Sequence, residues 1–164
     1  MGVYHSSLNV VAVTRALSKV VARRGKCMSN LLGPEEIGQL APSGHYIALR
    51  IGFAFPMEEV NALSPEWISH YTKQRFALFD PVLRWAYSNT GAIRWSEFTM
   101  DDPKRVITQA SAFGMRYGVT VSIFDSSADA QRSFASFTRS DREYTDLEVK
   151  LLQAYLKRRH TETA

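Results

Sequence analysis

The sequence predicts an α/β (α+β) fold: an α-β-α sandwich with a central, mainly antiparallel five-stranded sheet flanked by helices. Three observations lead to this prediction. The strand-like segments are few, helical segments lie before and after them, and no internal repeat or interdomain linker interrupts the order. A chain of 164 residues with 45% hydrophobic side chains can bury one sizeable core. We therefore expect residues 1–164 to form a single domain.

Charge and cysteine content narrow the classes of function. The formal net charge of +4 permits weak attraction to nucleic acid but does not require it, and an excess of this size is usually solvated. Cys27 is the only cysteine, so neither an intrachain disulfide nor a cysteine-rich zinc site can form. The apolar residues 10–21 contain Arg15 and Lys19 and therefore fit neither a signal peptide nor a membrane span. We expect a cytoplasmic protein without a membrane partner.

The first third of the chain predicts a helix followed by strands. Residues 9–24 have the apolar spacing of an amphipathic helix, and residues 33–44 carry proline and glycine near their ends, as a short helix or a loop does. Residues 46–53 alternate in the manner of a strand, and residues 57–63, after Pro56, predict a second one. The side chains expected on one face of the first strand are Ile47, Leu49, Ile51 and Phe53.

The middle of the chain contains three predicted helix starts. Ser64-Pro65-Glu66 combines a capping serine, a proline suited to the first turn and a glutamate near the positive end of the helix dipole. Asp80-Pro81 repeats this pattern with an aspartate cap and predicts a helix to about Ser88. Asp101-Asp102-Pro103 predicts a third helix, which Gly114 ends.

Two more strands and one helix complete the predicted order. Residues 118–124 and 133–138 alternate as strands do, and a polar turn over residues 125–129 separates them. Thr145 and Glu148 have the spacing of a capping box and predict a final helix to about residue 159.

The stretch from Trp67 to Trp95 is the most informative for function. Within it a single aspartate, Asp80, lies among tryptophan, tyrosine and phenylalanine residues. Such a set suits the lining of an apolar pocket that must also hold one polar group. Trp67 and Tyr71 fall one helical turn apart, on the same face. The stretch therefore predicts recognition of a small amphiphile rather than catalysis.

The sequence contains none of the common catalytic motifs. It has no Gly-x-Ser-x-Gly elbow, no Gly-x-Gly-x-x-Gly and no phosphate-binding Gly-Lys-Thr loop. His5, His45, His70 and His160 show no metal-ligand spacing, and we expect His70 to face solvent. We therefore predict no catalytic residues, no metal site and no enzymatic activity.

One set of residues is specific as a whole, although each member is ordinary by itself. In chain order the set is Trp67, Tyr71, Asp80-Pro81-Val82, Trp95, Phe113-Gly114, Gly118 and Ala135-Ser136-Phe137. In this order and spacing it resembles the ligand-binding domain of LuxR-type quorum-sensing receptors, which bind N-acyl-homoserine lactones. The resemblance covers the larger, C-terminal part of the chain.

The resemblance implies five ligand-binding residues. In the family, the equivalent of Trp67 donates its indole N–H to the lactone carbonyl, and the equivalent of Asp80 accepts the ligand's amide N–H. Tyr71 and Trp95 would wall the head-group pocket, and Ser136 would reach the acyl-amide region or a 3-oxo group. The resemblance implies no cofactor besides the lactone ligand, and it implies a homodimer or a heterodimer with a LuxR-type regulator.

Each of these residues also has a purely structural explanation. Trp67, Tyr71 and Trp95 could be plain packing residues. Asp80, which precedes a proline, could serve only as a helix cap. The face on which Ser136 lies depends on the pairing of its strand. At the level of sequence both explanations stay open.

The chain departs from the family pattern in three ways. Leu63 stands where the family usually has a tyrosine whose hydroxyl bonds the ligand's amide carbonyl, so that donor is missing. Ser122 replaces a common proline, and we expect this change to be neutral. The sequence ends at Ala164, where the family continues into a helix-turn-helix, so we expect no DNA-binding domain and no direct DNA binding. Gly114 and Gly118 are expected to serve backbone geometry rather than ligand contact.

These observations support two main hypotheses. The first is a cytoplasmic quorum-sensing receptor domain that binds an N-acyl-homoserine lactone, as the sensor of a transcriptional regulator or as a domain-only modulator. The alternative is a ligand-independent interaction or dimerisation module that inhibits a full-length LuxR-type regulator by heterodimerisation, and Leu63 favours it. A lactone-cleaving enzyme is a third hypothesis.

Overall fold

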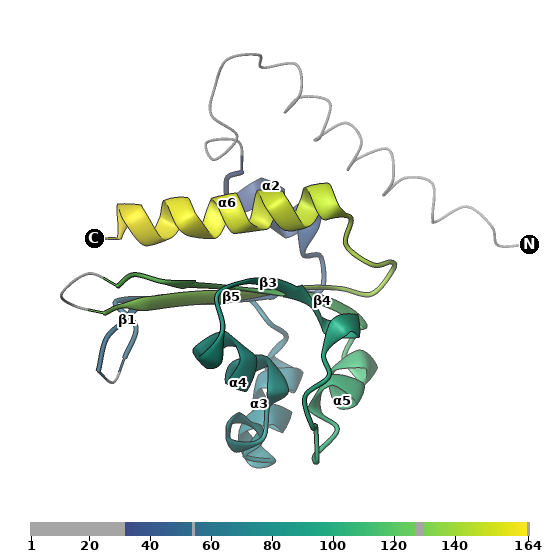
Figure 1. Cartoon of the computed structure of the whole chain (residues 1–164). Helices are drawn as coiled ribbons and strands as arrows, with labels where there is room; N and C mark the ends of the chain where they lie inside the picture. Colours follow the sequence, from purple (N-terminus) through teal and green to yellow (C-terminus); the bar gives the residue numbers. More distant parts are fainter. Residues whose placement is uncertain (1–31, 54, 127–129, 164) are drawn as a thin grey trace, which may run out of the picture.

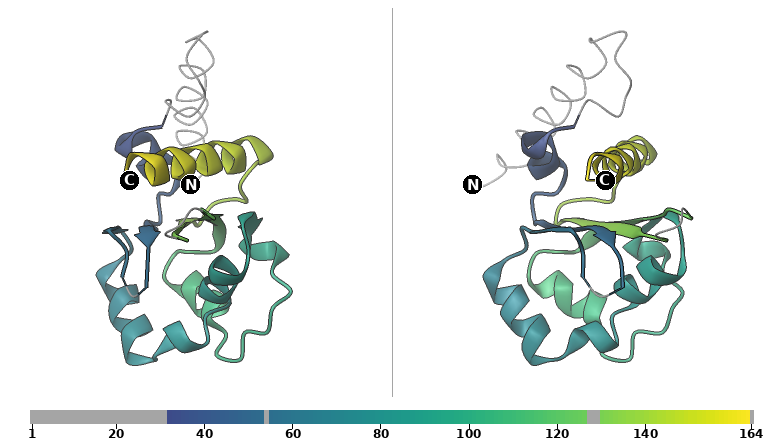
Figure 2. Two further views of the ribbon diagram at one scale, coloured as in Figure 1. Left: turned by 60° about the vertical axis from the view of Figure 1, so that its left-hand side comes forward. Right: turned by 90° about the vertical axis from the view of Figure 1, so that its left-hand side faces the viewer.

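The described part of the chain folds into three layers, with a sheet between two layers of helices (Figure 1). The computed structural model describes residues 32–53, 55–126 and 130–163, so the helix predicted for residues 9–24 lies outside it. Helices α2 (Pro34–Leu40) and α6 (Asp146–Glu162) cover one face of the sheet. Helices α3 (Pro65–Lys73), α4 (Pro81–Ser88) and α5 (Val106–Ala112) cover the other (Figure 2). The predicted α-β-α sandwich is confirmed.

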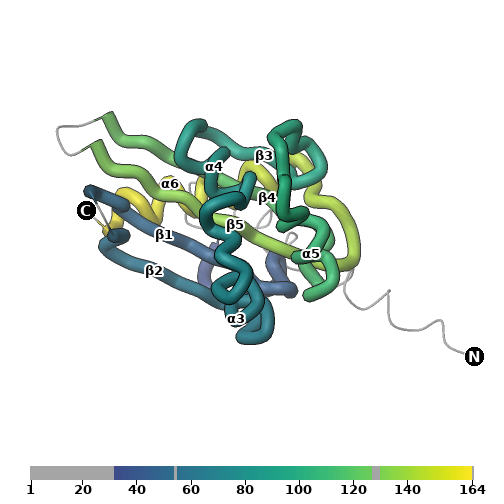
Figure 3. Tube along the Cα trace, turned by 90° about the horizontal axis from the view of Figure 1, so that it is seen from below, coloured from purple at the N-terminus to yellow at the C-terminus, as the bar shows by residue number. Residues whose placement is uncertain are grey.

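The sheet has five strands in the order β2-β1-β5-β4-β3, and every neighbouring pair is antiparallel (Figure 3). The strands are β1 (His45–Ile51), β2 (Glu58–Asn61), β3 (Gly91–Arg94), β4 (Tyr117–Phe124) and β5 (Arg132–Arg139). The strand number is as predicted, but the sequence pattern does not locate β3. Its four residues are too few to show alternation, and only pairing with β4 defines it. Two short 3₁₀ helices, η2 (Phe76–Leu78) and η3 (Trp95–Glu97), complete the fold.

A β-bulge corrects the predicted face of β1. Arg50 has a φ of 53°, and the register with β5 shifts between Ala48 and Ile51. The extra residue places Ile51 in one cluster with Ala48, on the side of α4, whereas Ile47 packs toward α6. Phe53 lies beyond the strand and is fully exposed. The predicted common face was therefore wrong for Ile51, because one inserted residue reverses the alternation, and for Phe53, because the strand ends before it.

Two of the three predicted helix starts lie where expected. Ser64 caps α3 and Asp80 caps α4, each through a side-chain oxygen that accepts a backbone N–H. α5 begins at Val106, later than predicted. The Asp102 carboxylate reaches forward to accept the first two backbone N–H groups of this helix, at 2.8 and 3.0 Å. Arg105, the residue directly before this helix, has a φ of 53°, which an α-helix does not contain.

The two faces of the sheet are packed differently. The α2 and α6 side holds the largest core cluster, which is filled by side chains from both helices and the central strands. On the other side, two smaller clusters form around Trp67 and around Phe134. The fully buried members of the large cluster include Ile37, Ile47, Leu49, Val119, Phe137, Leu151, Leu152 and Leu156.

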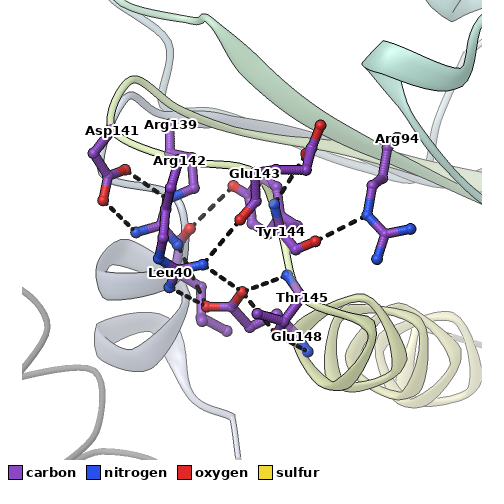
Figure 4. A network of polar contacts seen from close by, with 9 residues as sticks. All are labelled: Leu40, Arg94, Arg139, Asp141, Arg142, Glu143, Tyr144, Thr145 and Glu148. Carbon is purple, nitrogen blue, oxygen red and sulfur yellow. Dashed lines mark hydrogen bonds and ion pairs between the residues drawn. The ribbon is translucent and has the colours of Figure 1, made fainter.

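A buried ionic network fixes the start of α6 (Figure 4). The Glu148 side chain is 1% exposed and accepts hydrogen bonds from Arg142 at 2.7 and 2.9 Å and from the Thr145 N–H at 2.8 Å. Arg139 lies 3.4 Å from the same carboxylate. Burial opposes ionisation of Glu148, but the bonds from Arg142 and Thr145 outweigh it, so its pKa lies below the usual value. The predicted capping box of Thr145 and Glu148 is confirmed.

We predict that Glu148→Gln lowers the free energy of unfolding by about 3 kcal/mol, because the arginines lose a buried counter-charge. The folded-state pKa of Glu148 is lowered, so its contribution is complete above the unfolded-chain value of 4.5 and is lost as the pH falls through the folded-state pKa. The difference between the proteins should therefore shrink in acid. Urea unfolding across pH measures it, and Glu162→Gln, in a surface pair, is the control with an effect below about 0.5 kcal/mol.

Candidate functional site

A cavity of about 210 Å³ lies on the side of the sheet that α3, α4 and α5 cover. Strands β1 and β5 supply one wall, and the three helices supply the others. All five residues predicted from the sequence line this cavity: Trp67, Tyr71, Asp80, Trp95 and Ser136. Other lining residues are Tyr46, Asn61, Leu63, Thr72, Leu83, Ile107, Met115, Phe134 and Thr138.

Asp80 is both a helix cap and part of the cavity wall. Its Oδ1 accepts the Val82 N–H at 2.8 Å, and its Oδ2 accepts the Tyr71 hydroxyl at 2.7 Å. The residue is 6% exposed, and burial raises the pKa of its carboxyl group, which the bonds from Tyr71 and Val82 offset only in part. Burial and the nearby Asp80 charge also raise the pKa of Tyr71, so its hydroxyl stays protonated and donates. Asp80 is therefore a helix cap that also lines the cavity.

Trp67 lines the cavity and carries an indole N–H donor. α3 places it one turn before Tyr71, with the two ring centroids 5.6 Å apart in an edge-to-face arrangement. The residue is 5% exposed and lines the cavity. None of the described residues accepts a hydrogen bond from its indole N–H, and this nitrogen is not enclosed by protein atoms. The indole N–H is therefore not committed to an acceptor among the described residues.

Trp95 forms a wall of the cavity and has already used its donor. Its indole Nε1 donates to Thr120 Oγ1 at 3.0 Å. The ring lies flat against β4 at Gly118, where an added Cβ would come within 2.2 Å of Trp95 Cδ2. Gly118 thus serves backbone geometry, as predicted, because no larger residue leaves room for the indole.

Strand pairing decides the position of Ser136. It lies opposite Tyr46 on β1 and opposite Thr120 on β4, on the sheet face that lines the cavity. Its Oγ is 3.1 Å from Thr120 Oγ1, and the residue is 8% exposed. Ser136 therefore offers a hydroxyl to the cavity.

His70 is half-buried and hydrogen-bonded rather than simply solvent-facing, which corrects the prediction. Its Nε2 is 2.7 Å from Gln109 Oε1, and its ring stacks on Phe113 with centroids 5.2 Å apart. It follows Trp67 by three residues on α3, so it lies beside the Trp67 ring and joins the same aromatic cluster. His70 does not line the cavity.

Ser122 makes side-chain hydrogen bonds that a proline at this position could not make. Its hydroxyl donates to the Ala86 carbonyl at 2.7 Å and accepts from Arg132 at 2.8 Å. Arg132 also donates to the carbonyls of Ala86 and Asn89, at 2.9 and 2.6 Å. These bonds satisfy carbonyls at the end of α4 and hold that end on the sheet, while Asp80 holds its beginning.

Two kinds of structural feature are absent from the described residues. Within the described ranges no three histidine, cysteine, aspartate or glutamate side chains gather in a way that could hold a metal ion. In the same part of the chain, none of the helices has the length and apolar character that crossing a bilayer requires.

The fold and the cavity define a small-molecule receptor domain. The family model of the autoinducer binding domain matches residues 57–161, which is more than half of the chain, so the chain belongs to this family. The predicted LuxR-type resemblance is confirmed, and the family is one of signal receptors rather than enzymes. Comparison with curated proteins returns no match.

Solved structures with this fold include LuxR-type receptors. The N-acylhomoserine lactone-dependent LuxR family transcription factor CepR2 from Burkholderia cenocepacia is 17% identical with a TM-score of 0.56, over 96% of this chain and 94% of that one. The structure of SdiA residues 1–171 from Escherichia coli is 22% identical with a TM-score of 0.59, over 96% of this chain and 92% of that one. The structure of SdiA in complex with octanoyl-rac-glycerol is 21% identical with a TM-score of 0.58, over 99% of this chain and 67% of that one. At these identities the likeness shows the common fold.

We predict that Gly118→Ala lowers the free energy of unfolding by about 2 kcal/mol, because the new methyl group displaces the Trp95 ring. The matched control is Gly38→Ala in α2, where an added Cβ meets no atom within 4 Å. That change should raise stability by about 0.5–1 kcal/mol. Denaturant unfolding of both variants measures the contrast, and equal effects would contradict the close approach at Gly118.

We predict that Asp80→Asn raises the Tm of the ligand-free domain at neutral pH. Asparagine caps a helix as well as aspartate does and removes a buried charge. The folded-state pKa of Asp80 is raised, so the gain should grow as the pH rises through that pKa and disappear in acid. Tyr71→Phe is the opposing variant. It keeps the charge but removes a donor, and should cost about 1–3 kcal/mol.

Proposed function

We propose that this domain is a receptor for an N-acyl-homoserine lactone. One observation carries the proposal: an indole donor, Trp67, and a buried carboxylate acceptor, Asp80, line the same largely apolar cavity. The lactone carbonyl would accept from Trp67, and the ligand's amide N–H would donate to Asp80. A hydrogen bond to an ionised group contributes about 1.5–3 kcal/mol, which is enough to orient a small ligand.

The apolar wall supports a ligand with an acyl chain. Asp80 is the only charged residue among those that line the cavity. Much of the remaining wall is apolar, with side chains from Val82, Leu83, Ile107, Met115 and Phe134. Burial of each methylene contributes about 0.8 kcal/mol. The cavity of about 210 Å³ is smaller than the roughly 300–1,000 Å³ of typical drug-sized sites, which favours a short acyl chain.

The regulatory role follows from the receptor assignment. We propose that the domain acts in the cytoplasm, as the sensor part of a transcriptional regulator or as a domain-only modulator. In either case its macromolecular partner would be a second copy of itself or a LuxR-type regulator. The likeness to CepR2 and SdiA, which is one of fold, is compatible with both roles.

One observation favours the second candidate, a ligand-independent interaction module. Leu63 lines the cavity where the family usually supplies a hydroxyl, and its apolar side chain cannot donate to a ligand carbonyl. In this case the fold would be kept for heterodimerisation with a full-length LuxR-type regulator.

We predict that an N-acyl-homoserine lactone at about one hundred times its Kd raises the Tm by roughly 5–10 °C. Trp67→Phe should weaken binding about tenfold, because the ring stays but the donor is lost. The matched control is Trp85→Phe, since Trp85 packs on Phe98 and does not line the cavity. Thermal unfolding with short and long acyl chains gives the readout.

The outcomes separate the candidate functions. Equal shifts for Trp67→Phe and Trp85→Phe would sink the proposed site, and the lack of any shift in the wild type would favour the interaction module. Small molecules released by denaturing the purified protein identify the ligand class. Release of an acylglycerol, the type of ligand present in the SdiA complex, would contradict the lactone. Turnover of added lactone would indicate the cleaving enzyme instead.

A further inference from the structure

Trp95, Thr120 and Ser136 form a chain of hydrogen bonds at the cavity wall. Trp95 Nε1 donates to Thr120 Oγ1 at 3.0 Å, and Thr120 Oγ1 is 3.1 Å from Ser136 Oγ. Thr120 is 0% exposed and is not part of the cavity lining, whereas Ser136 is. The chain therefore runs from a partly buried indole, through a fully buried hydroxyl, to a hydroxyl at the cavity surface.

Burial decides which hydroxyl donates. Each hydroxyl has one proton to donate. If Ser136 donated to Thr120, the Thr120 proton would be left in a closed site, since no other described acceptor lies within bonding distance of Thr120 Oγ1. Buried donors are rarely left without an acceptor. If Thr120 donates to Ser136 instead, every buried group is paired and the Ser136 proton remains available at the cavity.

We propose that Thr120 is a positioning residue that turns the Ser136 hydroxyl proton into the cavity. The inference rests on the lactone-binding function proposed above and deepens it. Trp95 fixes Thr120 as an acceptor on one side, Thr120 therefore donates on the other, and Ser136 is left as a donor toward the ligand. The site then offers two neutral donors, Trp67 and Ser136, and one anionic acceptor, Asp80.

This arrangement assigns a substitute for the donor that Leu63 cannot supply. Of the other hydroxyls that line the cavity, Tyr71 donates to Asp80, Thr72 to the Ile68 carbonyl and Thr138 to the Gly44 carbonyl. For the fourth, Tyr46, burial and a hydrogen bond with Glu59 raise the pKa, so this hydroxyl is engaged with Glu59. Two donors with one acceptor complement a ligand that has two carbonyls and one N–H. Ser136 is thus the donor for the amide carbonyl, and its orientation is set from behind by Thr120.

The test is a double-mutant cycle with N-hexanoyl-homoserine lactone as the probe, measured by calorimetry. Thr120→Val and Ser136→Ala should each weaken binding about tenfold. Because Thr120 acts through Ser136, adding Thr120→Val to Ser136→Ala should cost less than about twofold more. Thr120→Ser keeps a hydroxyl and should retain wild-type affinity. Thr108→Val, at an exposed position of α5, is the matched control.

The thioamide analogue of the probe, whose sulfur is a weaker acceptor, gives a second readout. A change in packing alone would not alter the preference between amide and thioamide. Wild type should prefer the amide, and Thr120→Val should lose that preference. Full additivity of the two substitutions, or failure of Thr120→Ser to rescue, would overturn the positioning role.

A ligand-free measurement separates this inference from the lactone assignment. In the apo protein, NMR should show a slowly exchanging Thr120 hydroxyl proton close to the Ser136 β protons. A protected Ser136 hydroxyl proton directed at Thr120 would refute the inference, whatever the ligand. Absence of lactone binding by the wild type would count against the proposed function, and the NMR result would still decide the direction of the hydrogen-bond chain.

Discussion

The arrangement of the cavity depends on one constraint, the buried carboxylate of Asp80. It closes the first turn of α4 through the Val82 N–H and holds the neighbouring helix through the Tyr71 hydroxyl. Burial raises its pKa, so the ionised form destabilises the fold when only these two donors are present. A ligand N–H that reaches this carboxylate therefore stabilises the domain as it binds, which links affinity to folding.

The two faces of the sheet differ in how they are packed. On the α6 side, tightly packed apolar side chains and the ionic network of Glu148 hold the helix against the strands. On the other side, two smaller core clusters and the short helices leave a cavity, and polar bonds at both ends of α4 keep that helix in place. A rigid sheet backed by one dense layer can thus support an open layer in which side chains remain available to a ligand.

Several residues both support the fold and line the cavity. Asp80 caps a helix and faces the cavity, and Trp95 packs on Gly118 while its indole anchors Thr120. The choice between a core residue and a site residue is therefore not exclusive here. A cavity wall must itself be packed and hydrogen-bonded, because only a side chain held in place from behind can meet a small ligand in a defined orientation.

The sequence by itself determined the layer order and the caps at Ser64, Asp80 and Thr145, because these depend on local spacing and residue chemistry. The five residues that line the cavity followed from the resemblance of the sequence to the LuxR-type family. Tertiary structure alone decided the rest. The bulge at Arg50 reversed the face of Ile51, pairing with β4 defined β3, and register placed Ser136 beside Thr120. These features arise from hydrogen bonds between segments far apart in the chain, which no local pattern specifies.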